Sequence, residues 1–355
     1  MSEFKFPTPV GGTPFPSDFA PSVLFAALYG LLVPVMLYRM FHRSSRTILL
    51  FGSIPFSVER VVIFSLRAVM SRSESQRLSK GLVTYMQISF GLGFIGLASD
   101  LVKIIRCLVV NPTYGSETYA QSPAAETEAS YRDRFRGTYG REGFLGPPPE
   151  GTPDYPRRRF WARRFSDFAG LAFLAATVPG IVANVHFSSI VEDPSKGDKT
   201  MLLRYVSSGV ALFLTCILGA ATVWARCCLT RVSRRGTLII ANLTILLSVI
   251  GIYRLRIMYN TTPSLLSIGP GSLNSPGDKA GFYVLHVLPE WLTNAILVTV
   301  NIKQMLGTGM WGDWRFRDET PDERAKRERK EATQVQRRSP RPPVSNANGC
   351  SKEGA

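Results

Sequence analysis

The sequence predicts an all-α polytopic membrane protein, a bundle of seven transmembrane helices with its N-terminus outside and its C-terminus inside. The 355 residues contain long runs that are nearly free of charge. Each run is about 20 residues long, the length that an α-helix needs to cross about 30 Å of hydrocarbon. Short Arg-rich stretches separate the runs, whereas a soluble domain would place charges along every element.

The apolar runs divide the chain into helices and polar segments. The predicted spans cover residues 21–41, 47–70, 81–107, 168–190, 202–227, 237–258 and 281–305. Spans one to three therefore fall within residues 19–110, and spans four to seven within residues 165–305. Composition predicts disorder in three further parts: the outer N-terminus (1–18), most of a basic inner loop (111–164), and a basic inner tail (306–355).

The orientation follows from the positive-inside rule. An outer N-terminus places Arg43, Arg46, the basic cluster at 157–164 and the basic tail on the inner side. The loop at 72–80 is also basic and is the exception, since it falls outside.

Two possible modification sites agree with this orientation. Asn260 begins a glycosylation sequon in a loop that falls outside. Cys227 and Cys228 fall at the inner end of the fifth span, where they fit palmitoylation or two buried structural thiols equally well.

Composition and motifs exclude several classes of function. The net charge of +16 comes from Arg and Lys beside apolar runs and in polar segments, so we do not expect nucleic acid as a partner. Five cysteines and three histidines form no metal-binding pattern. Hydrolase, zinc-protease and phosphate-loop motifs are missing from the sequence. We therefore expect no enzymatic activity, no cofactor and no metal.

Ionisable residues within the spans are the candidates for function, because each costs about 2.5–3.5 kcal/mol to insert without a partner or a wet cavity. Glu59, Arg254, His286 and Glu290 are such residues. We expect a polar cluster in the outer half, with Glu59 or Glu290 paired to Arg254. His286 and Glu290 share a helix face and would share a proton or a polar head group. Structural ion pairs between helices explain the same residues equally well.

Three stretches resemble the fungal lipid-translocating-exporter-like proteins, the seven-span family associated with aminocholesterol resistance. They are Ser57-Val58-Glu59-Arg60 with Arg67, then Ile252-Tyr253-Arg254, and the aromatic run from Phe282 to Pro289. The chain departs from the family at Ile257 and His286, where acids are usual, and in its longer 111–164 loop. The resemblance implies transport or flipping of sphingoid bases and related amphiphiles, or resistance to toxic lipids.

These observations predict a protein that binds or moves an amphiphilic lipid or cationic amphiphile in an outer-half polar cavity. The candidate ligand-binding residues are Glu59, Arg254, Tyr283, His286 and Glu290. Buried carboxylates would attract an amine head group. Membrane lipids are the expected partners, in the plasma membrane or the endoplasmic reticulum. Two alternatives remain: a receptor or sensor that signals through the basic inner loops and tail, and a scaffold whose basic inner surface holds anionic lipids.

Overall fold

The computed structural model describes residues 5–42, 44–132, 147–190 and 197–338. The chain divides into two compact units, residues 1–314 and residues 315–355. The first unit is a helical bundle, and the described part of the second contains one helix, α13 (Pro321–Arg338). Strand is confined, within the described residues, to one antiparallel pair. The all-α prediction is therefore confirmed.

Six helical stretches in the described residues are long and apolar enough to cross a membrane. They contain α1 (Phe19–Phe41), α2 (Ser53–Arg72), α6 (Pro156–Val185), α8 (Gly197–Cys228), α9 (Arg234–Ile257), and the continuous run of α10 (Pro276–Phe282), η6 (Tyr283–Val287) and α11 (Leu288–Thr299). The chain is an integral membrane protein on this evidence. A further long helix, α4 (Lys80–Val110), has 31 residues and coincides with the third predicted span.

The remaining described elements are short. They are β1 (Phe6–Pro7), η1 (Pro16–Asp18), η2 (Ile48–Leu50), α3 (Glu74–Arg77), η3 (Asn111–Thr113), η4 (Tyr119–Gln121), α5 (Pro123–Arg132), α7 (Phe187–Ile190), β2 (Thr261–Thr262) and α12 (Ile302–Leu306).

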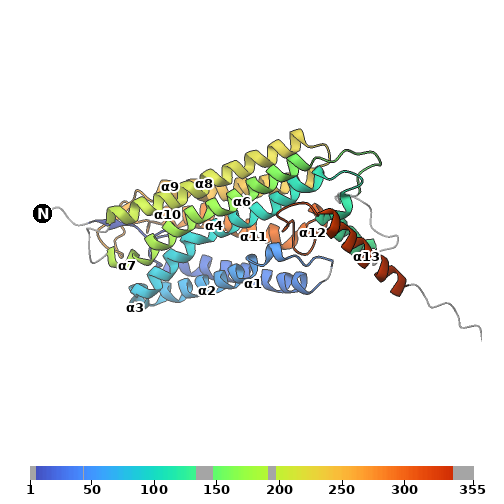
Figure 1. Cartoon of the computed structure of the whole chain (residues 1–355). Helices are drawn as coiled ribbons and strands as arrows, with labels where there is room; N and C mark the ends of the chain where they lie inside the picture. Colours follow the sequence, from blue (N-terminus) through green and yellow to red (C-terminus); the bar gives the residue numbers. More distant parts are fainter. Residues whose placement is uncertain (1–4, 43, 133–146, 191–196, 339–355) are drawn as a thin grey trace, which may run out of the picture. The chain divides into compact units, whose positions relative to one another are not determined.

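The long helices of the first unit pack around α4. Helix α4 contacts α2, α6, α8, α9 and α11, while α1 packs on α2 and α11. Figure 1 shows α1 and α2 along one side of this unit and α8 and α9 along the other. We call the end that holds residues 5–18 and the start of α10 the N-terminal end. The opposite end holds the α1–α2 connection and the end of α11.

The last helical run shows how local sequence shapes the interior. Ser275 caps α10 by accepting a hydrogen bond from the backbone N–H of Asp278 at 3.2 Å, and Pro276 follows at the first helical position. Pro289 has no N–H and its ring disfavours a regular turn before it. The five residues Tyr283–Val287 accordingly form a π-helical turn. Tyr283 and His286 are both buried in this turn.

Burial in the bundle differs from that in a soluble protein, because apolar side chains cover the exterior as well as fill the core. Large apolar side chains face outward, including Leu31, Phe168 and Phe213, each more than 60% exposed. The largest fully buried side chains are arginines, among them Arg60 and Arg254. An apolar exterior matches hydrocarbon as the solvent, and buried charges require partners inside the protein.

The structure folds parts of the segments that composition assigns to disorder. Residues 5–18 pack into the N-terminal end, where Phe6 and Val10 are at most 3% exposed. The 111–164 loop contains α5 and the start of α6, although its residues 133–146 lie outside the described part. The 306–355 tail begins with a packed stretch in which Thr308 is fully buried, and continues into α13. Composition alone missed the tertiary contacts that order these stretches.

Candidate functional site

A buried ion pair joins α2 to α11 at the centre of the bundle. Arg60 donates through Nε to Glu290 Oε2 at 2.9 Å and through Nη2 to Glu290 Oε1 at 2.7 Å. Both side chains are 0% exposed. This two-bond geometry is the strongest form of an arginine–carboxylate pair. Gly93 of α4 makes room for it, because a Cβ at this position would overlap the guanidinium.

Glu59 completes this cluster from the side. Its Oε2 accepts from Arg60 Nη1 at 2.8 Å, and Ser89 of α4 bonds both residues. The Glu59 side chain is 30% exposed, so it lies at the edge of the cluster. Both carboxylates in this cluster therefore already have a protein cation as a partner.

A second buried cluster lies nearer the N-terminal end. Asp18 pairs with Arg67 at 2.9 Å and with Lys279 at 2.9 Å. The Tyr283 hydroxyl lies 3.0 Å from Asp18 Oδ1 and 2.9 Å from Ser22 Oγ, and it accepts from Arg67 Nε at 3.1 Å. Tyr283 therefore belongs to this cluster rather than to that of Glu290.

The spacing of the charged residues explains why the two clusters lie along one seam. Arg60 and Arg67 are seven residues apart on α2, and Tyr283 and Glu290 are seven apart on the last helical run. Seven residues are close to two helical turns, so each pair lies on one face. The two runs are antiparallel neighbours, which places Arg60 opposite Glu290 and Arg67 opposite Tyr283.

The N-terminal segment is part of the second cluster. The Gly11 carbonyl accepts from Arg67 Nη2 at 2.6 Å and from Lys279 Nζ at 3.0 Å. Gln87 of α4 accepts from the Val10 backbone N–H at 2.8 Å. Gly11 has a φ of +76°, and a Cβ there would overlap the ring of Phe282. Residues 5–13 thus cover the polar interior at this end of the bundle.

Arg254 does not form the predicted pair with Glu59 or Glu290. It donates from Nη1 to the Phe90 carbonyl at 2.6 Å and from Nε to Ser208 Oγ at 3.2 Å. Its guanidinium lies 5.2 Å from the centre of the Phe94 ring. The prediction is wrong because Arg60 lies closer to both carboxylates and occupies them.

His286 is fully buried, and neither ring nitrogen has a hydrogen-bond partner in the part of the chain that the structure describes. Its ring stacks on Phe282 at 5.5 Å and meets Phe90 edge to face at 6.0 Å. The predicted sharing of a proton with Glu290 does not occur, because both Glu290 oxygens accept from Arg60.

The predicted modification sites differ in exposure. Cys227 and Cys228 are free and exposed at the end of α8, which contradicts the alternative of two buried thiols. The Asn260 amide donates to the Ile257 carbonyl at 3.0 Å, and Thr262 of the same sequon is 1% exposed in β2.

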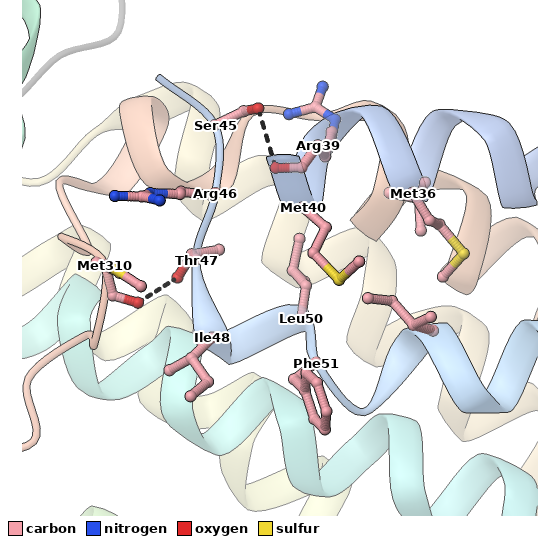
Figure 2. Close-up of a pocket in the computed structure, with 12 residues that line it drawn as sticks. Met36, Arg39, Met40, Ser45, Arg46, Thr47, Ile48, Leu50, Phe51 and Met310 are labelled. Carbon is pink, nitrogen blue, oxygen red and sulfur yellow. Dashed lines mark hydrogen bonds between the residues drawn. The ribbon is translucent and has the colours of Figure 1, made fainter. Parts of the chain in front are cut away.

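An apolar pocket lies at the opposite end, between the end of α1 and the start of α2 (Figure 2). Its cavity volume is about 240 Å³. The lining residues are Met36, Arg39, Met40, Ser45, Arg46, Thr47, Ile48, Leu50, Phe51, Ile54, Val298 and Met310. Figure 2 shows Met40 and Leu50 between the helices, and Arg39 and Arg46 toward the connection. The sequence did not single out this pocket, because its residues are ordinary for the end of a span.

The chain was compared with protein-family models, curated proteins and solved structures, and none of the three comparisons found a match.

Proposed function

We propose that this integral membrane protein binds an amphiphile with an anionic head group in the pocket between α1 and α2. The observation that carries the proposal is the combination of an apolar cavity with two arginines and no acid among its lining residues. Ligand pockets in proteins commonly pair an apolar lining with a few polar groups that fix orientation.

One part of the pocket lining is apolar and suits a hydrocarbon tail, and another part is basic and suits an anionic head group. Met36, Leu50 and Ile54 offer apolar surface, and Phe51 is 64% exposed at the opening. Burying a hydrocarbon tail there gains about 0.8 kcal/mol per methylene. Arg46 is exposed, and its planar guanidinium fits a carboxylate or phosphate through two hydrogen bonds. Arg39 already donates one bond to the Thr299 carbonyl at the same edge.

The proposed anionic head group differs from the cationic amphiphile of the sequence prediction, and it stays within the predicted class of amphiphilic lipids. An amine would need an unpaired carboxylate, but Glu290 and Glu59 both bind Arg60. Placing an amine there would first break a buried pair, which costs several kcal/mol. The proposal keeps the predicted amphiphile class and assigns it an anionic head.

The proposal includes a topology of seven spans with the N-terminus outside. The length of α4 supports its assignment as the third span, which brings the number of spans to seven, because 31 helical residues extend about 46 Å. Arg46 and Arg235 lie at the end opposite residues 5–18, which the positive-inside rule favours for the inner side. Protease or antibody access to terminal tags on intact cells tests this orientation.

Direct binding in nanodiscs tests the proposed function. The purified full chain in phosphatidylcholine nanodiscs is titrated with a fluorescent long-chain carboxylate, a long-chain phosphate and a long-chain amine. We expect saturable binding of both anions and no saturable binding of the amine. Arg46→Gln should weaken anion binding about tenfold, because a hydrogen bond to a charged group contributes about 1.5–3 kcal/mol. Stronger binding of the amine would overturn the proposal.

Two further variants locate the bound molecule. Ile54→Trp fills the pocket and should abolish binding of both anions. Arg256→Gln is the matched control, since Arg256 is exposed near the N-terminal end and stacks on Tyr259 at 4.6 Å. Equal losses in Arg46→Gln and Arg256→Gln would show nonspecific attraction to positive charge and would contradict the proposed site.

A further inference from the structure

We propose a second anion-binding site inside the bundle, in which Arg204, Arg254 and Ser208 hold a carboxylate or phosphate group. The site lies between α8 and α9, beneath residues 5–13, and it is separate from the pocket at the opposite end. Its ligand is a small dianion or the head group of an anionic lipid.

The geometry begins with α8. Arg204 and Ser208 are four residues apart and therefore lie on one helix face. Arg254 of α9 donates to Ser208 Oγ at 3.2 Å, which brings the two guanidinium groups to the same region. Arg204 and Arg254 both carry a positive charge, and like charges repel each other. Both side chains are 1% exposed, so water does not screen this repulsion.

The second observation is that two of the three guanidinium nitrogens of Arg204 lack hydrogen-bond partners among the described residues, although the guanidinium lies 5.5 Å from the centre of the Phe187 ring. Its one hydrogen bond in the described part of the chain goes from Nη1 to the Thr8 carbonyl, at a long 3.4 Å. Its buried Nε and Nη2 have no partner. Buried N–H groups are nearly always satisfied in proteins, and an unsatisfied one marks strain, function or a missing ligand. Guanidinium donors call for an anion.

The acids nearby do not supply that anion. Glu290 is held by Arg60, and Asp18 by Arg67 and Lys279. Among the described residues, no carboxylate forms an ion pair with Arg204 or Arg254. An added anion would supply the ion-pair partner that these two arginines lack among the described residues.

His286 extends the site on the side of the last helical run. Its ring lies against Phe90, whose carbonyl accepts from Arg254, and against Tyr253 at 6.2 Å. Both ring nitrogens are buried without partners. A neutral imidazole carries one N–H. His286 thus offers a further donor next to Arg254.

The N-terminal segment contacts Arg204 and covers this site. The Thr8 carbonyl accepts the hydrogen bond from Arg204. Thr8 is 3% exposed and is therefore shielded from solvent. The short β1–β2 pair, Phe6–Pro7 with Thr261–Thr262, holds the segment in place. An anion entering from this end would replace the Thr8 carbonyl on Arg204 with a stronger, charge-assisted bond.

Thermal unfolding of the full chain in uncharged detergent, followed by tryptophan fluorescence, tests the site. Inorganic phosphate and succinate are each titrated to 5 mM at constant ionic strength, and phosphatidic acid is compared with phosphatidylcholine in nanodiscs. We expect a saturable rise in Tm of about 2–5 °C either with the free anions or with phosphatidic acid. A rise with the free anions that Arg204→Met abolishes identifies a soluble ligand, and a rise with phosphatidic acid alone that Arg204→Met abolishes identifies a lipid head group. A rise with phosphatidic acid that only Ile54→Trp abolishes belongs to the pocket between α1 and α2 and would overturn the second site. The absence of a rise both with the free anions and with phosphatidic acid would overturn the proposal.

Three variants assign the effect to these residues. Arg204→Met and Arg254→Met should each abolish the rise, and Arg204→Lys should retain part of it. Ser208→Ala, a smaller change, should weaken the apparent affinity several-fold and is informative even if an arginine variant does not fold. Arg256→Gln removes an exposed arginine that belongs to neither site and should leave the rise unchanged. An undiminished rise in both Arg204→Met and Ser208→Ala would refute the site.

Discussion

Two pairs of arginines are equally buried in this bundle but differ in their partners. Arg60 and Arg67 are at most 1% exposed, and each pairs with a carboxylate at 2.7–2.9 Å. Arg204 and Arg254 are each 1% exposed, and their hydrogen bonds go to carbonyl and hydroxyl oxygens. From this difference we infer a structural role for Arg60 and Arg67 and a binding role for Arg204 and Arg254.

The physical reason is the cost of burying charge. A buried pair roughly balances its desolvation cost, and the loss of one partner leaves an uncompensated charge. An unpaired buried arginine has the same desolvation cost, and no ion pair offsets it. Loss of Arg60 or Arg67 alone should therefore destabilise the bundle, whereas Arg204 and Arg254 should reduce stability until an anion binds.

Arg60→Leu should have the largest effect. It leaves Glu290 buried without its partner, so we expect a loss of about 3–5 kcal/mol in the free energy of unfolding. Reversible unfolding in mixed micelles measures the change. The double variant Arg60→Met with Glu290→Leu should recover most of the loss, because it removes both charges. A loss below about 1 kcal/mol in Arg60→Leu would show that the central pair is not structural.

Asp18→Asn should have the next largest effect, about 2–3 kcal/mol. It removes the negative charge that holds Arg67 and Lys279 together. Residues 5–14 should then exchange their amide hydrogens much faster, because their carbonyl contacts depend on those two cations. Hydrogen-exchange mass spectrometry measures this, with Glu74→Gln as the control at an exposed position of the same end. Unchanged protection of residues 5–14 would contradict the role of Asp18.

Arg204→Met should change stability in the opposite direction. In buffer without added phosphate or carboxylate, we expect a gain of about 1–2 kcal/mol, since the variant removes a buried charge whose N–H groups lack partners. The same unfolding experiment measures it. A loss as large as that of Arg60→Leu would mean that Arg204 is a structural residue and would remove the contrast between the two pairs.

The sequence predicted the long helices well because their signal is local. Apolar runs of about 20 residues reflect a requirement for length alone. The six described candidate spans lie close to predicted ones, except that the span of α6 begins at Pro156 rather than at residue 168. The order of residues 5–18 was missed because it depends on the distant cations Arg67 and Lys279. Composition does not report such contacts.

The candidate site was predicted in its residue types but not in its pairing. Glu59, Arg254, His286 and Glu290 all lie in the polar interior or at its edge, as insertion cost requires. The choice of Arg60 over Arg254 as the partner of Glu290 depends on which helices are neighbours, and sequence spacing does not supply this. The seven-residue spacing of Arg60 and Arg67 was the available signal. Arg204 was missed because it falls near the start of a predicted span, where an arginine is ordinary.

We expect the smallest stability change at a paired arginine on the edge of the bundle. This pair tests whether burial decides how much an ion pair matters. Arg159 holds Asp154 through bonds of 2.8 and 3.0 Å, but the Asp154 side chain is 28% exposed. Burial would raise the pKa of Asp154, but hydrogen bonds from Arg159, Thr118 and Gly115 outweigh it and lower the pKa below 3.8. The pair should therefore contribute stability above about pH 4 and lose it as the pH falls further. Because solvent screens the pair, Asp154→Asn should cost less than about 1 kcal/mol at pH 7 and should flatten the acid limb of the Tm–pH curve. A cost comparable to that of Arg60→Leu would show that burial does not decide the value of these pairs.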